Sequence, residues 1–160
     1  MESPNEQNSF HGPHTDLLRS SFRDWTGKDL IDDSLDSRAG AKYLFEAPFA
    51  LLSHYQPLSD PILNYGNKTV LSLFEVSWKE LIQMPSRLTA EPHEREERAE
   101  LMRRVSKNGY IDDYTGIRIS KSGKRFLIEQ ATVWNLIDSQ GTYKGQAAIF
   151  SDWVQLPKNN

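Results

Sequence analysis

The chain has 160 residues, of which 38% are hydrophobic and 26% are charged, and its formal net charge at pH 7 is −3. These values are typical of one globular domain with an extension, large enough to bury a core without cross-links. The absence of cysteine excludes disulfides and a cysteinyl–flavin adduct, and it favours a cytoplasmic location. Dispersed basic residues argue against a nucleic-acid partner, and no apolar run approaches the ~18 residues of a membrane span.

The first part of the chain is predicted to be a tail followed by helices. Residues 1–14 are rich in Ser, Asn, Gln and Pro, and we expect a disordered tail there. Residues 15–48 form a helical extension: one helix ends at Gly27 and a second begins at Ser37. The first helix has an apolar stripe made by Leu18, Phe22 and Trp25. We expect both helices to cover the outer face of a sheet. The alternative is a dimer contact through the same stripe.

Residues 49–154 are predicted to form a domain that begins and ends with strands. The expected elements are strands at 49–54 and 61–65, helices at 68–76, 77–84 and 92–107, and strands at 110–119, 125–137 and 143–153. A turn is expected around Pro57, and Ser77 with Glu80 matches a capping box. Residues 154–160 are expected to fray.

The helix at 92–107 has an apolar side and a charged side. Its inner side carries Leu101, Met102 and Val105. Glu94 with Arg98, and Glu100 with Arg104, are spaced as i, i+4 pairs on the outer side. A charged stripe of this kind is typical of a solvated helix face.

The strand at 125–137 is apolar on both of its alternating faces. One face carries Phe126, Ile128, Gln130, Thr132, Trp134 and Leu136, and the other carries Leu127, Glu129, Ala131, Val133, Asn135 and Ile137. A strand that is half exposed should instead alternate apolar and polar residues. We therefore expect packing on both sides of the sheet, by the preceding helices on one side and the N-terminal region on the other.

Two strands, a helical crossover and a three-stranded meander are the layout of a PAS domain. The segments with family character are 60–67, 73–75, 85–87, 90–91, 94–97, 109–119, 123–126, 131–136 and 145–147. Over about residues 37–153 the chain resembles the MEKHLA family, a PAS-like group, and is most similar to its stand-alone bacterial members. The resemblance implies an α+β fold: a five-stranded antiparallel sheet with short helices on one face, beside the N-terminal helical extension.

The resemblance also implies a pocket between the inner face of the sheet and the helices, as in PAS-like domains that sense small molecules. The residues it nominates for ligand binding are Phe74, Trp78, Arg87, Tyr114, Arg118, Ile128, Thr132, Trp134, Gln146, Ala148 and Phe150. Ala148 is expected opposite Trp134, which would leave space for a ligand. The alternative is that these residues simply fill a core.

The polar candidates have more than one interpretation. Arg87 can bind a ligand carboxylate or pair internally with Glu129 or Asp113. Arg118 lies either on a polar pocket wall or in an exposed ladder with Asp112. A cluster of Asp112, Asp113 and Glu129 could serve acid–base chemistry, suit a metal ion or form a plain ionic network with Arg or Lys.

No catalytic nucleophile–base pair and no complete zinc-protease motif is apparent, and the sequence does not identify a cofactor. The sequence therefore predicts a stand-alone PAS-like domain that binds a small molecule as a sensor, without catalytic output of its own. A homodimerisation module is the alternative. A small enzyme that uses the acidic cluster is the less favoured interpretation.

Overall fold

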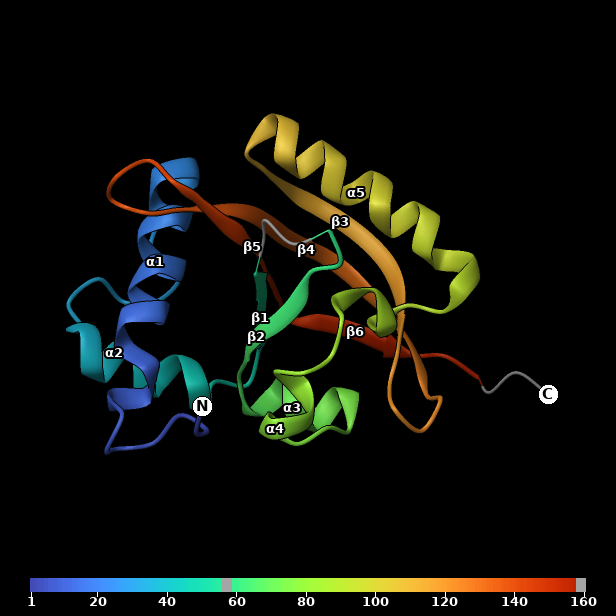
Figure 1. Ribbon diagram of the computed structural model, residues 1–160, viewed down its shortest axis with the longest axis horizontal. Helices are drawn as coiled ribbons and strands as arrows, with labels where there is room; N and C mark the ends of the chain where they lie inside the picture. The colour runs from blue at the N-terminus through green and yellow to red at the C-terminus, as the bar shows by residue number, and fades with distance from the viewer. Residues whose placement is uncertain (56–58, 158–160) are drawn as a thin grey trace.

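Six antiparallel strands form one sheet, which separates two groups of helices. The computed structural model describes residues 1–55 and 59–157, so the turn expected around Pro57 lies outside the described residues. In chain order the elements are η1 (Ser9–His11), α1 (Gly12–Thr26), α2 (Ser37–Glu46), β1 (Ala50–Tyr55), β2 (Ile62–Gly66), α3 (Lys68–Phe74), α4 (Trp78–Leu81), η2 (Ser86–Thr89), η3 (Pro92–Glu94), α5 (Arg95–Asn108), β3 (Tyr110–Ile119), β4 (Arg125–Ile137), β5 (Tyr143–Phe150) and β6 (Asp152–Gln155), where η denotes a 3-10 helix. Figure 1 shows their arrangement.

The strands follow the order β2-β1-β5-β4-β3, and the short β6 also pairs with β4. The long β4 pairs with β3 along one edge, while β5 and β6 pair with its C-terminal and N-terminal parts along the other. The predicted bounds of β3 and β4 are confirmed. The strand predicted at 143–153 is divided into β5 and β6, so the sheet has one strand more than expected.

A β-bulge at Gln130 reverses the side-chain alternation of β4. Gly116 pairs with Ile128 and Tyr114 pairs with Ala131, so two steps on β3 correspond to three steps on β4. Gln130 takes up the extra residue with φ of 50°. The prediction of an unbroken alternation along this strand is therefore wrong beyond Ile128.

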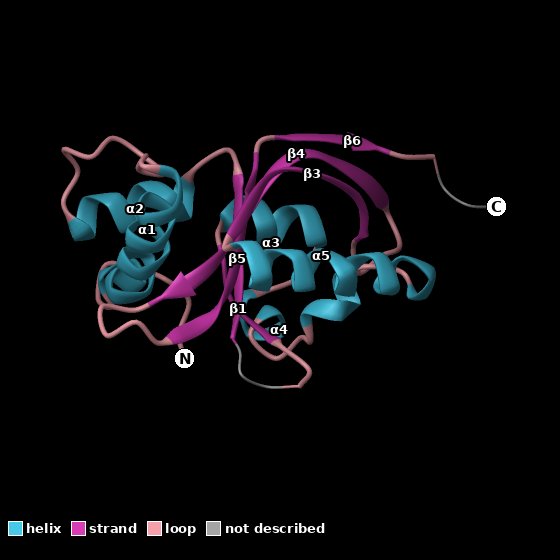
Figure 2. Ribbon diagram, turned by 90° about the horizontal axis from the view of Figure 1, so that it is seen from above, coloured by secondary structure: helices cyan, strands magenta, loops and turns pink. Residues whose placement is uncertain are grey.

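Helices cover both sides of the sheet, as predicted. In Figure 2, α3, α4 and α5 lie on one side of the strands, and α1 and α2 lie on the other. The local signals that start these helices are confirmed: the Asn67 side chain accepts from the Val70 amide at the start of α3, and Ser77 with Glu80 forms the capping box of α4. None of the described helices is long and apolar enough to cross a bilayer.

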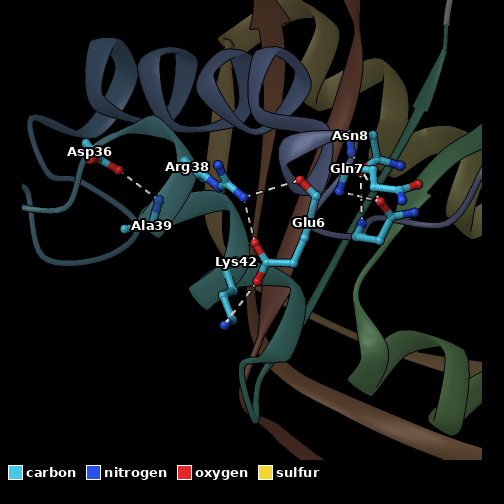
Figure 3. Close-up of polar contacts among 8 residues, drawn as sticks. Glu6, Gln7, Asn8, Asp36, Arg38, Ala39 and Lys42 are labelled. Atoms are coloured by element: carbon cyan, nitrogen blue, oxygen red, sulfur yellow. Dashed lines mark hydrogen bonds and ion pairs between the residues drawn. The ribbon is translucent and has the colours of Figure 1, made fainter.

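The N-terminal residues are folded onto the domain, which corrects the expectation of a disordered tail over residues 1–14. The Phe10 ring is buried and lies 6.4 Å from the ring of Phe45. Glu6 forms ion pairs with Arg38 and Lys42 of α2 at 2.7 and 3.4 Å (Figure 3). Because one aromatic side chain and one carboxylate both find partners on α2, the segment is ordered despite its polar composition, and α1 begins already at Gly12.

Helix α1 packs against the end of β4. The indole nitrogen of Trp134 donates to the Leu18 carbonyl at 3.3 Å, and that of Trp25 donates to the Asn135 carbonyl at 3.0 Å. Leu18 is fully buried, and the Phe22 ring meets the Trp134 ring edge-on at 5.0 Å. The apolar stripe of α1 thus covers the outer face of the sheet within the same chain, as expected.

Candidate ligand pocket

A cavity of about 80 Å³ lies between the inner face of the sheet and α5. Strands β1, β3, β4 and β5 form its floor, and α3, η2 and α5 close it. Most of its wall is apolar, with contributions from Leu63, Phe74, Leu101, Ile128, Val133 and Phe150. The cavity also contains several buried polar side chains, which set its chemistry.

Arg98 reaches the cavity from the inner side of α5. The residue is 7% exposed, and its guanidinium group donates to the Ser86 hydroxyl. Burial, and to a smaller extent the charge of Arg118, lowers the pKa of Arg98 to about 10, so it stays charged at neutral pH. None of the ion pairs between described residues involves Arg98. A buried cation without a paired anion is costly, so this group is available to bind one.

Arg118 approaches the same cavity from β3. The residue is 8% exposed, its guanidinium lies 5.3 Å from the centre of the Tyr114 ring, and it donates to the Ile117 carbonyl at 2.8 Å. The charge of the exposed Glu97 on α5 acts on Arg118 at longer range, but among the described residues no ion pair to Arg118 is formed. Burial raises the pKa of the Tyr114 hydroxyl, which keeps it neutral.

His54 and Ser86 extend the polar set toward β1. The His54 ring lies with Nδ1 3.0 Å from the Ser86 hydroxyl oxygen. That oxygen already accepts from Arg98, so the hydroxyl proton is free to be donated to Nδ1. This arrangement leaves the ring proton on Nε2, a buried atom that has no partner among the described residues. Burial is the main cause that lowers the pKa of His54 to about 3, so the ring is neutral.

Gln146 of β5 contributes an acceptor. Its side-chain nitrogen donates to the Asn135 side-chain oxygen at 3.1 Å and lies 3.2 Å from the Met102 carbonyl. Its side-chain oxygen is buried without a hydrogen-bond donor in the described part of the chain. Buried polar atoms normally form hydrogen bonds. An acceptor without a partner beside a donor without a partner, here the His54 Nε2–H, is therefore typical of a site that binds a ligand.

The match to known proteins agrees with this architecture. Residues 13–155 match the model of the MEKHLA domain. This chain belongs to the MEKHLA family. The match begins at residue 13, so the MEKHLA domain includes α1, which the sequence resemblance over residues 37–153 left outside, in addition to α2. No curated protein matches the chain at a significant level.

Solved structures similar to this MEKHLA domain are PAS and LOV (light-oxygen-voltage) domains. The PAS domain of a protein from Colwellia psychrerythraea has a TM-score of 0.59 and 18% identity, covering 72% of this chain and 92% of that one. The light-state dimer of the fungal blue-light photoreceptor Vivid has a TM-score of 0.58 and 14% identity, covering 84% and 90%. A LOV domain studied with a flavin analogue has a TM-score of 0.55 and 18% identity, covering 73% and 84%. The chain therefore has the fold of PAS and LOV sensory domains.

The structure brings part of the predicted ligand-binding set of this MEKHLA domain together. The predicted residues that line the cavity are Phe74, Tyr114, Arg118, Ile128, Gln146, Ala148 and Phe150. Those that do not line it are Trp78, Arg87, Thr132 and Trp134. The four exceptions have different structural causes.

Thr132 and Trp134 point to the other side of the sheet because the bulge at Gln130 reverses the alternation. Trp134 consequently pairs with Ala147, and Ala148 pairs with Val133 instead of lying opposite Trp134 as expected. Trp134 is a packing anchor for α1.

Trp78 and Arg87 also lie away from the cavity. Trp78 stacks on the His11 ring at 5.3 Å and meets the Tyr65 ring edge-on. Arg87 is half-exposed and pairs with Asp60 at 3.1 Å. An internal pair was one of the two interpretations of Arg87, but its partner is neither Glu129 nor Asp113.

Sequence reasoning did not nominate Arg98, Ser86 or His54, all of which line the cavity. Arg98 was placed on the solvated side of its helix because of its i, i+4 spacing from Glu94. Its spacing from the apolar residues was the better signal, since Arg98 precedes Leu101, Met102 and Val105 by three, four and seven positions.

The predicted acidic cluster does not assemble into one site. Asp112 and Asp113 are exposed. Asp113 lines a surface hollow beside α5, while Glu129 lines a different one beside β6. Among the described residues, no group of three His, Cys, Asp or Glu side chains is arranged to bind a metal ion.

Proposed function

We propose that this MEKHLA domain is a sensory domain that binds a small molecule in the cavity under α5, without catalytic output of its own. The observation that supports the proposal is a set of buried polar atoms in this cavity that have no partner among the described residues, beside two arginines without an ion pair there: the His54 Nε2, the Tyr114 hydroxyl and the Gln146 side-chain oxygen. A packed core would leave no reason to bury these groups together.

Flavin is the first candidate to consider, because one similar structure is a LOV domain studied with a flavin analogue. The chain has no cysteine to form a covalent flavin adduct. Its cavity of about 80 Å³ is also well below the ~300–1,000 Å³ of pockets for drug-sized ligands. A flavin therefore does not fit between α5 and the sheet, and the proposed ligand is smaller.

The alternatives have less support. The apolar stripe of α1, offered for a homodimer contact, is covered by β4 of the same chain. Of the carboxylates offered for an enzyme, Asp113 and Glu129 line separate surface hollows, and Asp112 is exposed. The cavity therefore supports the proposed function better than the helix stripe or the carboxylates support the alternatives.

The proposal is tested by native mass spectrometry of the full chain as purified, followed by thermal-shift screening against neutral, cationic and anionic metabolites. We expect at least one compound to raise the melting temperature, because a ligand at 100 times its Kd adds about 2.7 kcal/mol to the free energy of unfolding. Ala148→Leu fills the cavity and should abolish this shift, while Ala39→Leu on the exposed side of α2 should keep it. A chain that carries no bound molecule and responds to no compound would contradict the proposal.

A further inference from the structure

We propose that the ligand is a small monocarboxylate, whose carboxylate group binds Arg98 and Arg118 while its apolar body lies against the wall formed by Ile128, Val133 and Phe150. This inference rests on the proposed ligand-binding function and adds the chemical class of the ligand. It follows from the charge, the donors and the size of the cavity, taken in turn.

The charge of the site is positive. Arg98 and Arg118 come from different elements, α5 and β3, yet both are buried at the same cavity. The described part of the chain supplies no carboxylate in an ion pair with either. A planar guanidinium group presents paired N–H donors that match the two oxygens of a carboxylate. An anionic ligand would thus neutralise charges that the protein leaves uncompensated.

The remaining polar atoms determine how a ligand is oriented in the cavity. Arg98 donates to Ser86, which leaves the Ser86 proton for His54 Nδ1 and the His54 proton on Nε2. His54 thereby offers one more N–H donor to an oxyanion. The Gln146 side-chain oxygen is an acceptor, whereas the His54 Nε2–H is a donor. A hydroxyl or amino substituent on the ligand would donate a hydrogen bond to this oxygen.

The size and lining of the cavity set the rest of the molecule. A space of about 80 Å³ excludes nucleotides and other large anions. Most of the wall is apolar, with Leu63, Leu101 and Phe150 among its residues, which disfavours inorganic anions and compounds with several charges. A carboxylate on a short aliphatic chain satisfies both conditions, whereas a benzene ring alone occupies a cavity of about 150 Å³.

The inference is tested by calorimetric titration of the full chain with propanoate and butanoate, with propanamide and butanamide as neutral counterparts, and with inorganic phosphate. We expect the carboxylates to bind at least about 10-fold more tightly than the amides, since one hydrogen bond to a charged group is worth this much. The affinity should change little from about 0.05 to about 0.5 M salt, because a buried ion pair is weakly screened. A titration with lactate, which is propanoate with a hydroxyl substituent, reports on Gln146: this hydroxyl should increase the affinity over propanoate.

Substitutions locate the binding site. Arg98→Met and Arg118→Met keep an unbranched apolar side chain and remove the guanidinium group with its charge, and each should weaken butanoate binding about 10- to 100-fold. Arg104→Met removes an exposed charge from the same helix and should leave binding unchanged. Without ligand, Arg98→Met should be as stable as the wild type or more stable, because it removes an unpaired buried charge. If Arg98→Met fails to fold, Arg98→Lys keeps the charge, loses the paired donors and should still weaken binding.

The outcomes separate this inference from the proposed function. Equal binding of carboxylates and amides, or binding that survives both Met substitutions, would overturn the carboxylate assignment and leave a cavity that binds a neutral ligand. Phosphate binding more tightly than butanoate would also overturn it. If no compound of any class binds, the proposed function itself is wrong.

Discussion

Ser21 and Ile137 exchange two hydrogen bonds. The Ser21 hydroxyl donates to the Ile137 carbonyl at 3.1 Å and accepts from the Ile137 amide at 3.0 Å. Ser21 is fully buried in the middle of α1, and Ile137 is the last residue of β4, just beyond a shift in the register with β5. The serine thus satisfies backbone groups where the strand ladder becomes irregular, which makes α1 an integral part of the domain.

Ser21→Ala should lower the free energy of unfolding by about 1–3 kcal/mol, because it leaves both backbone groups of Ile137 without partners. Urea denaturation followed by far-UV circular dichroism measures the change. Ser20→Ala, at an exposed neighbouring position, is the control and should be near neutral. Equal effects of the two substitutions would mean that the Ile137 groups are satisfied in another way.

Gly109→Ala should destabilise the domain more than Gly123→Ala. Both glycines have positive φ, 95° and 92°, which costs an alanine about 1–2 kcal/mol at either position. A Cβ atom on Gly109 would also lie 2.5 Å from the Trp25 ring, whereas Gly123 has nothing within 4 Å. The difference between their unfolding free energies therefore measures the packing of α1 on the start of β3. The prediction fails if the two variants are equally stable.

Trp134→Phe should lower stability by about 1–3 kcal/mol, since it removes the donor to the Leu18 carbonyl and leaves a gap in a fully buried site. It should not alter the thermal shift caused by compounds that bind, because Trp134 faces α1. Val133→Ala changes the cavity wall and should alter that shift. The opposite pattern would show that Trp134 lines the pocket, as the unbroken alternation predicted.

The domain should lose stability as the pH is lowered from about 6.5 to 4. Burial is the main cause that lowers the pKa of His54 to about 3 and that of His14 to about 4, with smaller contributions from the charges of Arg98 and His11. Both folded values lie below the ordinary value of about 6.5, so in this window the unfolded chain binds more protons than the folded one. By linkage, the stabilisation is complete above pH 6.5 and decreases as the pH falls toward the folded values.

Each histidine should account for on the order of 2 kcal/mol between pH 7 and pH 5. His54→Gln and His14→Gln remove these titrations, and the Gln at position 14 can keep the hydrogen bond to Ser53. Urea denaturation at pH 5, 6 and 7 should show a shallower decline for each variant and the shallowest for the double variant. A double variant with the full wild-type decline would assign the pH dependence to other groups.

Local signals in the sequence were sufficient to predict most of the helices and strands. The bounds of β3 and β4 and the caps at Asn67 and Ser77 depend on residues close together in the chain, and the structure confirms them. The long-range docking of Phe10 on Phe45 has no such local signal, and the tail was accordingly expected to be disordered. A composition rich in Ser, Asn and Gln does not reveal one buried aromatic side chain.

The candidate site was only partly predictable for the same reason. Tyr114 and Arg118 were nominated through the family resemblance, and both line the cavity from β3. Trp134 was placed on the wrong face because periodicity alone does not reveal where a strand gains an extra residue. Arg98 was assigned to the solvated side because its spacing from Glu94 fits an exposed i, i+4 ion pair. The same position also fits the inner side of the helix, and only the rotation of α5 about its axis against the sheet decides between the two.

The sequence by itself determined the order, type and approximate limits of the strands and helices, and hence the PAS-like class of the domain, because these follow from short-range propensity and patterning. Only the tertiary structure decided which side chains share the cavity. One added residue at Gln130 exchanges the two faces of β4, and the packing of α5 buries Arg98 beside Arg118. Both effects arise from contacts between segments far apart in the chain.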